Sequence, residues 1–186
     1  MNPLPFDEIN KFKETLSTHF ENGKVRSERD RADIIDEMLD LFLLAAANGS
    51  AFANESLGTD YNIGMKTAVD IIDREVAGKT WRQRVNEYFD NGGTEADIVR
   101  IAETEAHRDS NEAGYVTASK VGATKKVWHC MMLPTSRDQH IALDGVSSPI
   151  DGYFYTYTGA RTMFPGEFGD PENDVNCLCW LSYEKG

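Results

Sequence analysis

Helical periodicity fills the first two-thirds of the sequence and stops near Gly122, and this change constrains the fold more than any other feature. Ser27-Glu28-Arg29-Asp30 resembles a capping box. Apolar residues recur at helical spacing after it, which predicts a helix near 28–47 with Asn48-Gly49 as its stop. The same reasoning predicts helices over 65–76, from Thr80 to about 91, and from Thr94 onward. Residues 1–25 are expected to be helical as well.

Beyond Gly122 the pattern changes to the two-residue alternation that is typical of strands. Strands are predicted over 125–132, 152–159 and 176–183, with loops around the prolines between them. The middle strand would place Tyr153, Tyr155 and Tyr157 on one face, where they could stack on bases but better suit a core or interface. Helices followed by strands predict an α+β fold, with a helical N-terminal region and a small antiparallel sheet packed on the helices.

Acidic residues outnumber basic ones by 31 to 19, which gives a net charge of −12. Duplex binding needs clustered Lys and Arg, and Lys125-Lys126 is the nearest approach, so direct nucleic-acid binding is not expected. The charge favours solubility and a protein partner. No stretch approaches the roughly 20 apolar residues of a membrane span, and the N-terminus lacks the features of a secretory signal. We therefore expect a soluble protein with no membrane partner, made in a cytoplasm.

The three cysteines, Cys130, Cys177 and Cys179, are the strongest candidates for chemistry. Their number and spacing do not suit disulfides, so reduced thiols are expected. On a strand, Cys177 and Cys179 would point to one face about 7 Å apart, and with His140 they offer the ligand types of zinc. A fourth ligand would be His129, Cys130 or Asp144. The alternatives are simple packing of small buried thiols and, least favoured, redox chemistry, because the Cys-x-x-Cys geometry is missing.

Charged residues interrupt the apolar stripe of the helix that begins at Thr94. Ile98, Ile101 and Ala102 share a face, and the next positions on it are Glu105, Arg108 and Asp109. Buried charges must be paired, and Glu105 can pair with Arg108 on the helix itself. Three interpretations follow: the helix emerges into solvent, Arg108 is a structural clamp on backbone carbonyls of the sheet, or Glu105 is catalytic.

Five segments, in order, resemble the phage Mu F-like minor head proteins, also called phage head morphogenesis proteins. They are RIAETEAHRDSNEAG (100–114), KKVWHC (125–130), RDQHIALDG (137–145), MFPGEFGDP (163–171) and VNCLC (175–179). Each motif is weak alone, but the ordered set is specific and covers about residues 94–183. Two departures remove charge near the His/Cys group. Residues 132–135 lack an acidic residue that many relatives have, and Leu178 replaces an Arg.

The resemblance implies a phage head morphogenesis domain over 56–186, with helices over 65–121 and a β-rich part over 124–184. Residues 1–55 lie outside the resemblance and are expected to form a helical extension. Most signature positions are expected to be architectural. His140, Cys177 and Cys179 would tie the closing strand to the H-x-x-L-D-G element, with or without a zinc ion. The other signature residues are Thr104, Glu105, Arg108, Asn111, Trp128, Arg137, Asp144, Gly145, Pro165, Gly166 and Asn176.

The function implied by the resemblance is that of a minor structural component of a bacteriophage head, with no catalytic residue assigned. Such a protein acts in head assembly at the portal vertex or inner head surface, and in DNA packaging or delivery. Its expected partners are the portal and major capsid proteins. Its expected location is the virion, with the host cytoplasm during assembly. The alternative is a small metal-dependent hydrolase or toxin-like effector of a phage or prophage, with Glu105 as general acid/base.

Overall fold

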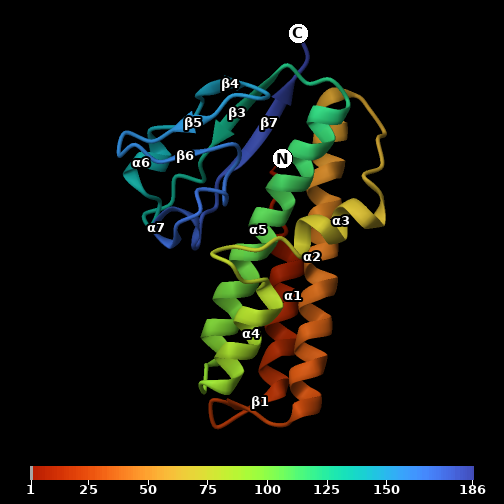
Figure 1. Cartoon of the computed structure of the whole chain (residues 1–186), viewed down its shortest axis with the longest axis vertical. Helices are drawn as coiled ribbons and strands as arrows, with labels where there is room; N and C mark the ends of the chain where they lie inside the picture. Colours follow the sequence, from red (N-terminus) through yellow and green to blue (C-terminus); the bar gives the residue numbers. More distant parts are fainter. Residues whose placement is uncertain (1) are drawn as a thin grey trace.

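The computed structural model describes residues 2–186, so Met1 of the expected N-terminal helix lies outside the described residues. Long helices form one part of the molecule, with one short hairpin at their far end, and the other small antiparallel sheets form the second part (Figure 1), which confirms the predicted α+β class. The helices are α1 (Phe6–Leu16), the 3-10 helix η1 (Ser17–His19), α2 (Glu28–Leu57), α3 (Gly64–Ile72), α4 (Trp81–Asp90), α5 (Glu95–Lys120), α6 (Asp138–Ile141) and α7 (Pro171–Asp174). The strands are β1 (Phe20–Glu21), β2 (Lys24–Val25), β3 (Lys125–His129), β4 (Ser147–Pro149), β5 (Phe154–Tyr155), β6 (Arg161–Thr162) and β7 (Trp180–Glu184).

Local capping signals fix the starts of three long helices where the sequence predicts them. The Ser27 side chain accepts a hydrogen bond from the backbone N–H of Asp30 at the start of α2. Thr80 and Thr94 form reciprocal capping boxes with the third residues of α4 and α5. Each cap satisfies backbone donors that the first turn leaves without partners.

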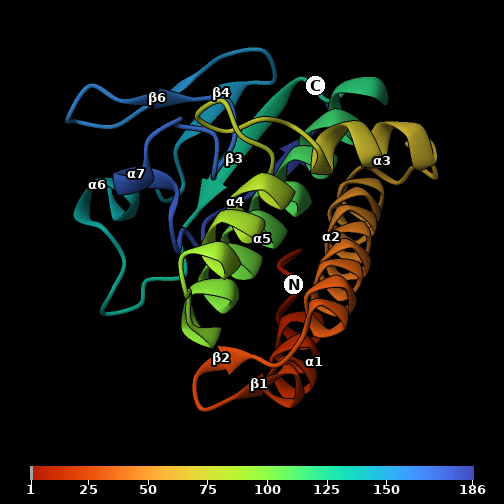
Figure 2. The ribbon, with the colours of Figure 1, turned by 60° about the horizontal axis from the view of Figure 1, so that its bottom comes forward.

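The predicted end of α2 at Asn48-Gly49 is wrong, because the helix continues to Leu57 and ends at Gly58 in the left-handed conformation. Gly49 serves a tertiary contact instead. A Cβ built on it would lie 1.9 Å from the backbone oxygen of Ser110 on α5, and one built on Gly114 would lie 3.1 Å from the oxygen of Gly49. The two helices therefore cross backbone against backbone, and only glycine fits at position 49. Figure 2 shows α2 and α5 side by side along this crossing.

One apolar core joins the N-terminal helices to those that follow. The boundary expected at residue 55 falls inside α2, and side chains of α1 and α2 share this core with those of α3, α4 and the first half of α5. Phe42 contacts Trp81 edge to face with ring centroids 5.0 Å apart, and both rings are fully buried. The N-terminal segment thus packs on the rest of the chain within a common core.

Two helices are shorter than predicted. α1 ends at Leu16, and the rest of the stretch expected to be helical forms η1 and the hairpin β1–β2, whose turn contains Asn22 and Gly23 at positive φ. α3 ends at Ile72, and Val76 pairs with Lys79 in an isolated bridge around the positive-φ residues Ala77 and Gly78. In both places a turn that favours positive φ interrupts the apolar periodicity.

The C-terminal part, here called the β lobe (residues 124–186), contains the antiparallel sheet β4–β3–β7 and the hairpin β5–β6. The predicted strands exist but are shorter, because β3 ends at His129, β5 covers two residues, and β7 begins only at Trp180. The tyrosine face is not core: Tyr153, Tyr155 and Tyr157 are 42%, 61% and 71% exposed. Figure 1 shows β3 and β7 beside the C-terminal half of α5, with α6 and α7 farther out.

The close crossing of α2 and α5 predicts that a methyl group added at Gly49 lowers stability more than one added at Gly114. We expect Gly49→Ala to lower the free energy of unfolding by about 1–3 kcal/mol through overpacking, despite the higher helix propensity of alanine. Gly114→Ala is the matched control, because its Cβ would meet its nearest atoms at 3.1 Å rather than 1.9 Å. Denaturant unfolding measures both. A Gly49→Ala protein as stable as the wild type would contradict the close crossing.

The contacts of His19 with α2 should make the stability of the protein depend on pH. Burial lowers its pKa, but hydrogen bonds and charges of Asp30 and Glu37 outweigh burial and raise the pKa above its usual 6.5. This stabilisation is fully present below the unfolded-state pKa and is lost as pH rises through the folded-state pKa. The stability difference between wild type and His19→Gln should be larger at about pH 5.5 than at about pH 8.5. Equal differences at both pH values would contradict the pairing.

Candidate functional site

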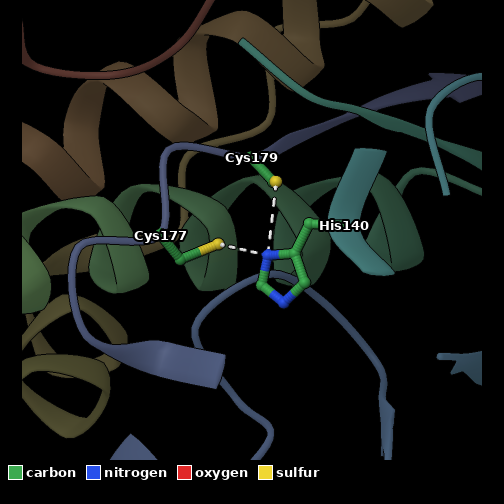
Figure 3. A group of neighbouring side chains, drawn as sticks. All are labelled: His140, Cys177 and Cys179. Atoms are coloured by element: carbon green, nitrogen blue, oxygen red, sulfur yellow. Dashed lines mark hydrogen bonds between the residues drawn. The ribbon is translucent and has the colours of Figure 1, made fainter. Parts of the chain in front are cut away.

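The structure brings together the three residues expected to bind metal. His140 comes from α6, and Cys177 and Cys179 come from the segment before β7 (Figure 3). The Nδ1 atom of His140 lies 3.5 Å from the sulfur of Cys177 and 3.7 Å from that of Cys179. All three ligand atoms lie within 4.8 Å of one another. The thiols are not on a strand, contrary to the prediction. Asn176, with φ of 57°, turns the chain before them and brings both sulfurs to one imidazole.

Hydrogen bonds on the far side of His140 determine its tautomer. Its Nε2 lies 3.2 Å from Oδ1 of Asn173. The amide nitrogen of Asn173 donates to the carboxylate of Asp170, at 3.1 and 3.0 Å from its two oxygens, which fixes Oδ1 as the atom facing the imidazole. Nε2 therefore carries the proton, and the lone pair of Nδ1 points at the sulfurs. In metal sites, an acceptor that bonds the other ring nitrogen of a histidine in this way orients the ring toward the metal.

The thiols of Cys177 and Cys179 have pKa values that are shifted in opposite directions. Hydrogen bonding from the Cys179 thiol lowers the pKa of Cys177 well below its usual value and outweighs burial, which alone would raise that pKa. The same hydrogen bond, burial and the neighbouring Cys130 thiol raise the pKa of Cys179. A thiolate is thus favoured at Cys177, which is the ionisation state that binds metal.

A small cavity of about 20 Å³ adjoins the three ligands, with room for roughly one water molecule or ion. Cys130 also lines it, and so does Arg137, whose guanidinium donates a 2.6 Å hydrogen bond to the carbonyl of Val175. The other two candidates for a fourth ligand have different roles. His129 bonds Ser182 at 2.7 Å and stacks on Trp180, and Asp144 accepts the backbone N–H of Cys130 at 2.8 Å.

A second polar group lies in the middle of α5, where residues 105–114 are all buried. Glu105 pairs with Arg84 of α4 at 2.6 Å and with Arg108 at 2.7 Å, and Arg108 also contacts Asp109 at 2.7 Å. The helix does not emerge into solvent here, because Arg108 is 3% exposed. The carbonyl that Arg108 contacts belongs to Ile71 of α3, so the expected clamp on sheet carbonyls is corrected to a clamp between two helices.

The pKa values of this charge network reflect its burial. Burial alone would lower the pKa of Arg108, but Asp109 and Glu105 raise it above its ordinary value. Burial raises the pKa of Asp109 to about 7, although Arg108 opposes the shift. Burial raises the pKa of Glu112 to about 7 as well, although the positive charge of Arg74 opposes the shift. Ion pairs offset part of the desolvation cost of these groups.

Several members of the network come from elements that the sequence did not connect to α5. Arg84 lies on α4, while Arg74, in the loop after α3, pairs with both Glu112 and Glu167. Spacing along α5 predicted the Glu105–Arg108 pair, because both residues lie on one helix. No local pattern indicates partners that are brought in by the fold.

The signature residues of α5 join it to the β lobe. The amide of Asn111 donates to the carbonyl of Cys179 at 3.0 Å and to that of His107 on its own helix at 3.0 Å. The backbone N–H of Asn176 donates to the hydroxyl of Thr104 at 3.4 Å. Gly166, at φ of 89°, places its backbone so close that a Cβ there would lie 3.1 Å from the Cβ of Arg108, and Pro165 beside it is buried. These contacts hold the segment that carries the thiols against α5.

Other signature residues build the interior of the β lobe. Trp128 is fully buried, and its ring meets those of His140, Phe154 and Phe168 edge to face, with centroids 5.2 to 6.1 Å apart. The N–H of Gly145 donates to the carbonyl of Trp128 at 2.9 Å, and Gly145 has φ of 75°, which glycine adopts readily. These residues position α6 and thereby His140.

A larger cleft of about 460 Å³ lies beside Glu105, between α4, α5 and the segment that contains α7. Arg84, Arg100 and Asp174 line it together with Glu105, and burial raises the pKa of Asp174 to about 6. The cleft shares no lining residue with the cavity beside the thiols. Glu105 and the His/Cys group therefore face different spaces.

Comparison with known proteins supports the resemblance. The sequence model of the family described as phage Mu protein F like protein matches residues 69–182, which is more than half of the chain. No curated protein and no solved structure matches the chain. Within residues 2–186, no helix has the length and apolar character required to cross a membrane. The chain belongs to the phage Mu protein F-like family of phage head morphogenesis proteins.

Proposed function

We propose that this protein is a minor structural component of the phage head that acts in head assembly at the portal vertex or the inner head surface. The observation that carries this proposal is that the signature residues make contacts that hold the fold together. Asn111 and Thr104 bond the backbone of the β lobe, Arg137 bonds the carbonyl of Val175, and Trp128 fills the lobe interior. These side chains stabilise the fold, which suits a protein that acts as a component of an assembled particle.

The groups that could perform hydrolysis are separated from one another. The oxygens of Glu105 pair with two arginines, at 2.6 and 2.7 Å, so that proton exchange with a substrate would require breaking an ion pair. The His/Cys group faces another cavity. A metal-assisted hydrolase needs its general base within hydrogen-bond reach of the metal-activated water. This separation favours the structural role over the hydrolase alternative.

An acidic groove between α1 and α2 suits a basic partner. Its volume is about 590 Å³, and its lining includes Phe12, Leu41 and the half-exposed Leu44. Four carboxylates and one lysine line the same groove: Asp7, Glu8, Glu37, Asp40 and Lys11. Apolar surface beside excess negative charge complements a segment with both basic and apolar residues. We assign this groove to a basic segment of the portal or major capsid protein, a role consistent with the net charge of −12.

Association with isolated portal rings and with empty proheads of the same phage tests the proposal. We expect binding that weakens as salt rises, because charge complementarity is screened. Asp40→Lys should weaken binding by about 5-fold, equivalent to ~1 kcal/mol for a surface charge contact. Co-sedimentation or interferometry measures both quantities.

Asp60→Lys is the matched control, because it makes the same charge change at an exposed residue outside the groove. It should bind like the wild type. No binding of the wild type to either portal or prohead would contradict the proposed function. Equal weakening by both variants would show that net charge rather than the groove determines binding.

A further inference from the structure

We propose that Cys130, His140, Cys177 and Cys179 form a closed four-ligand site for a zinc-class ion, which joins the end of β3, helix α6 and the segment before β7. The inference is independent of the proposed function. All four side chains are at least nine-tenths buried, with exposures of 7%, 2%, 5% and 2%. All four also line the same small cavity.

The distances at His140 match those of a tetrahedral site. With zinc–sulfur bonds of about 2.3 Å and a zinc–nitrogen bond of about 2.0–2.1 Å, the nitrogen–sulfur edge of a tetrahedron is about 3.6 Å. The two observed edges are 3.5 and 3.7 Å. Ordinary hydrogen bonds explain only one of these contacts well, because the single lone pair of Nδ1 cannot accept two thiol protons in good geometry. An ion between the three atoms satisfies both edges.

Cys130 is the fourth ligand that the structure favours. It lines the same small cavity as the other three residues, and its position is fixed by the hydrogen bond from its backbone N–H to the carboxylate of Asp144. His129 is the last residue of β3, bonds Ser182 and stacks on Trp180, and does not line the cavity. Asp144 is engaged by the Cys130 backbone and thus supports the ligand.

Charge balance is consistent with three thiolates. Zinc replaces the thiol protons, which pass to solvent, and the resulting site has one net negative charge. Arg137 lines the cavity and offsets this charge. Four protein ligands leave no open position for water or substrate, so the site is structural. Zinc would connect residue 130 to residues 177–179 across the sheet and fix α6 between them.

Zinc content and cobalt spectroscopy test the site in the full chain, purified under reducing conditions without chelator or metal-affinity tag. We expect about one zinc per chain in the wild type and none in Cys177→Ser/Cys179→Ser. Cys130→Ser should retain zinc but lose it to a competing chelator more than about 10-fold more readily. Its cobalt form should lose about a third of the sulfur-to-cobalt absorption, since one thiolate of three is gone.

His129→Gln is the control, and it should hold zinc and cobalt like the wild type. If the serine variants fail to fold, the absorption of wild-type cobalt protein still counts the thiolates. A reduced wild-type protein that takes up no zinc when zinc alone is added would overturn the site. Unchanged affinity and absorption in Cys130→Ser would remove Cys130 from it and leave a three-ligand site with an open position.

Discussion

Burial of the middle of α5 on every side is the constraint on which the rest of the structure depends. α2 crosses it at Gly49, α3 and α4 cover it through Arg108 and Arg84, and the β lobe closes over its remaining side. Residues 105–114 are all buried, so the charged groups in this stretch depend on ion pairs, which form both within α5 and with Arg84 and Arg74 from elsewhere in the fold. Folding of the helices and of the β lobe is thereby coupled.

This coupling connects the fold to the family's role. A joint built from buried ion pairs and hydrogen bonds resists local opening, which suits a protein that, under the proposed function, holds its shape while it contacts larger head subunits. The thiol-bearing segment lies at this joint, because Asn111 bonds the carbonyl of Cys179 and Thr104 accepts from Asn176. The His/Cys group closes the β lobe at the point where that lobe meets α5.

The sequence predicted features that depend on neighbours along the chain. Ser27, Thr80 and Thr94 cap helices locally, so the three helix starts were correct. The prediction that Gly49 ends the helix is wrong, because this glycine contacts Ser110, 61 positions away in the sequence. Residue chemistry and family resemblance identified His140, Cys177 and Cys179, but not the turn at Asn176 that brings the sulfurs together. The preference for Cys130 over His129 and Asp144 rests on contacts that the fold creates, because His129 bonds Ser182 and Asp144 accepts the backbone N–H of Cys130.

The central claim is that α5 and the β lobe form one cooperative unit through their shared polar joint. Native-state hydrogen exchange of the wild type and Asn111→Ala tests it most directly. The account predicts that amides of β7 and of residues 105–114 in α5 open with similar free energies, and that Asn111→Ala lowers both together by about 1–3 kcal/mol. Loss of protection confined to the mutated turn of α5, with β7 unchanged, would contradict it.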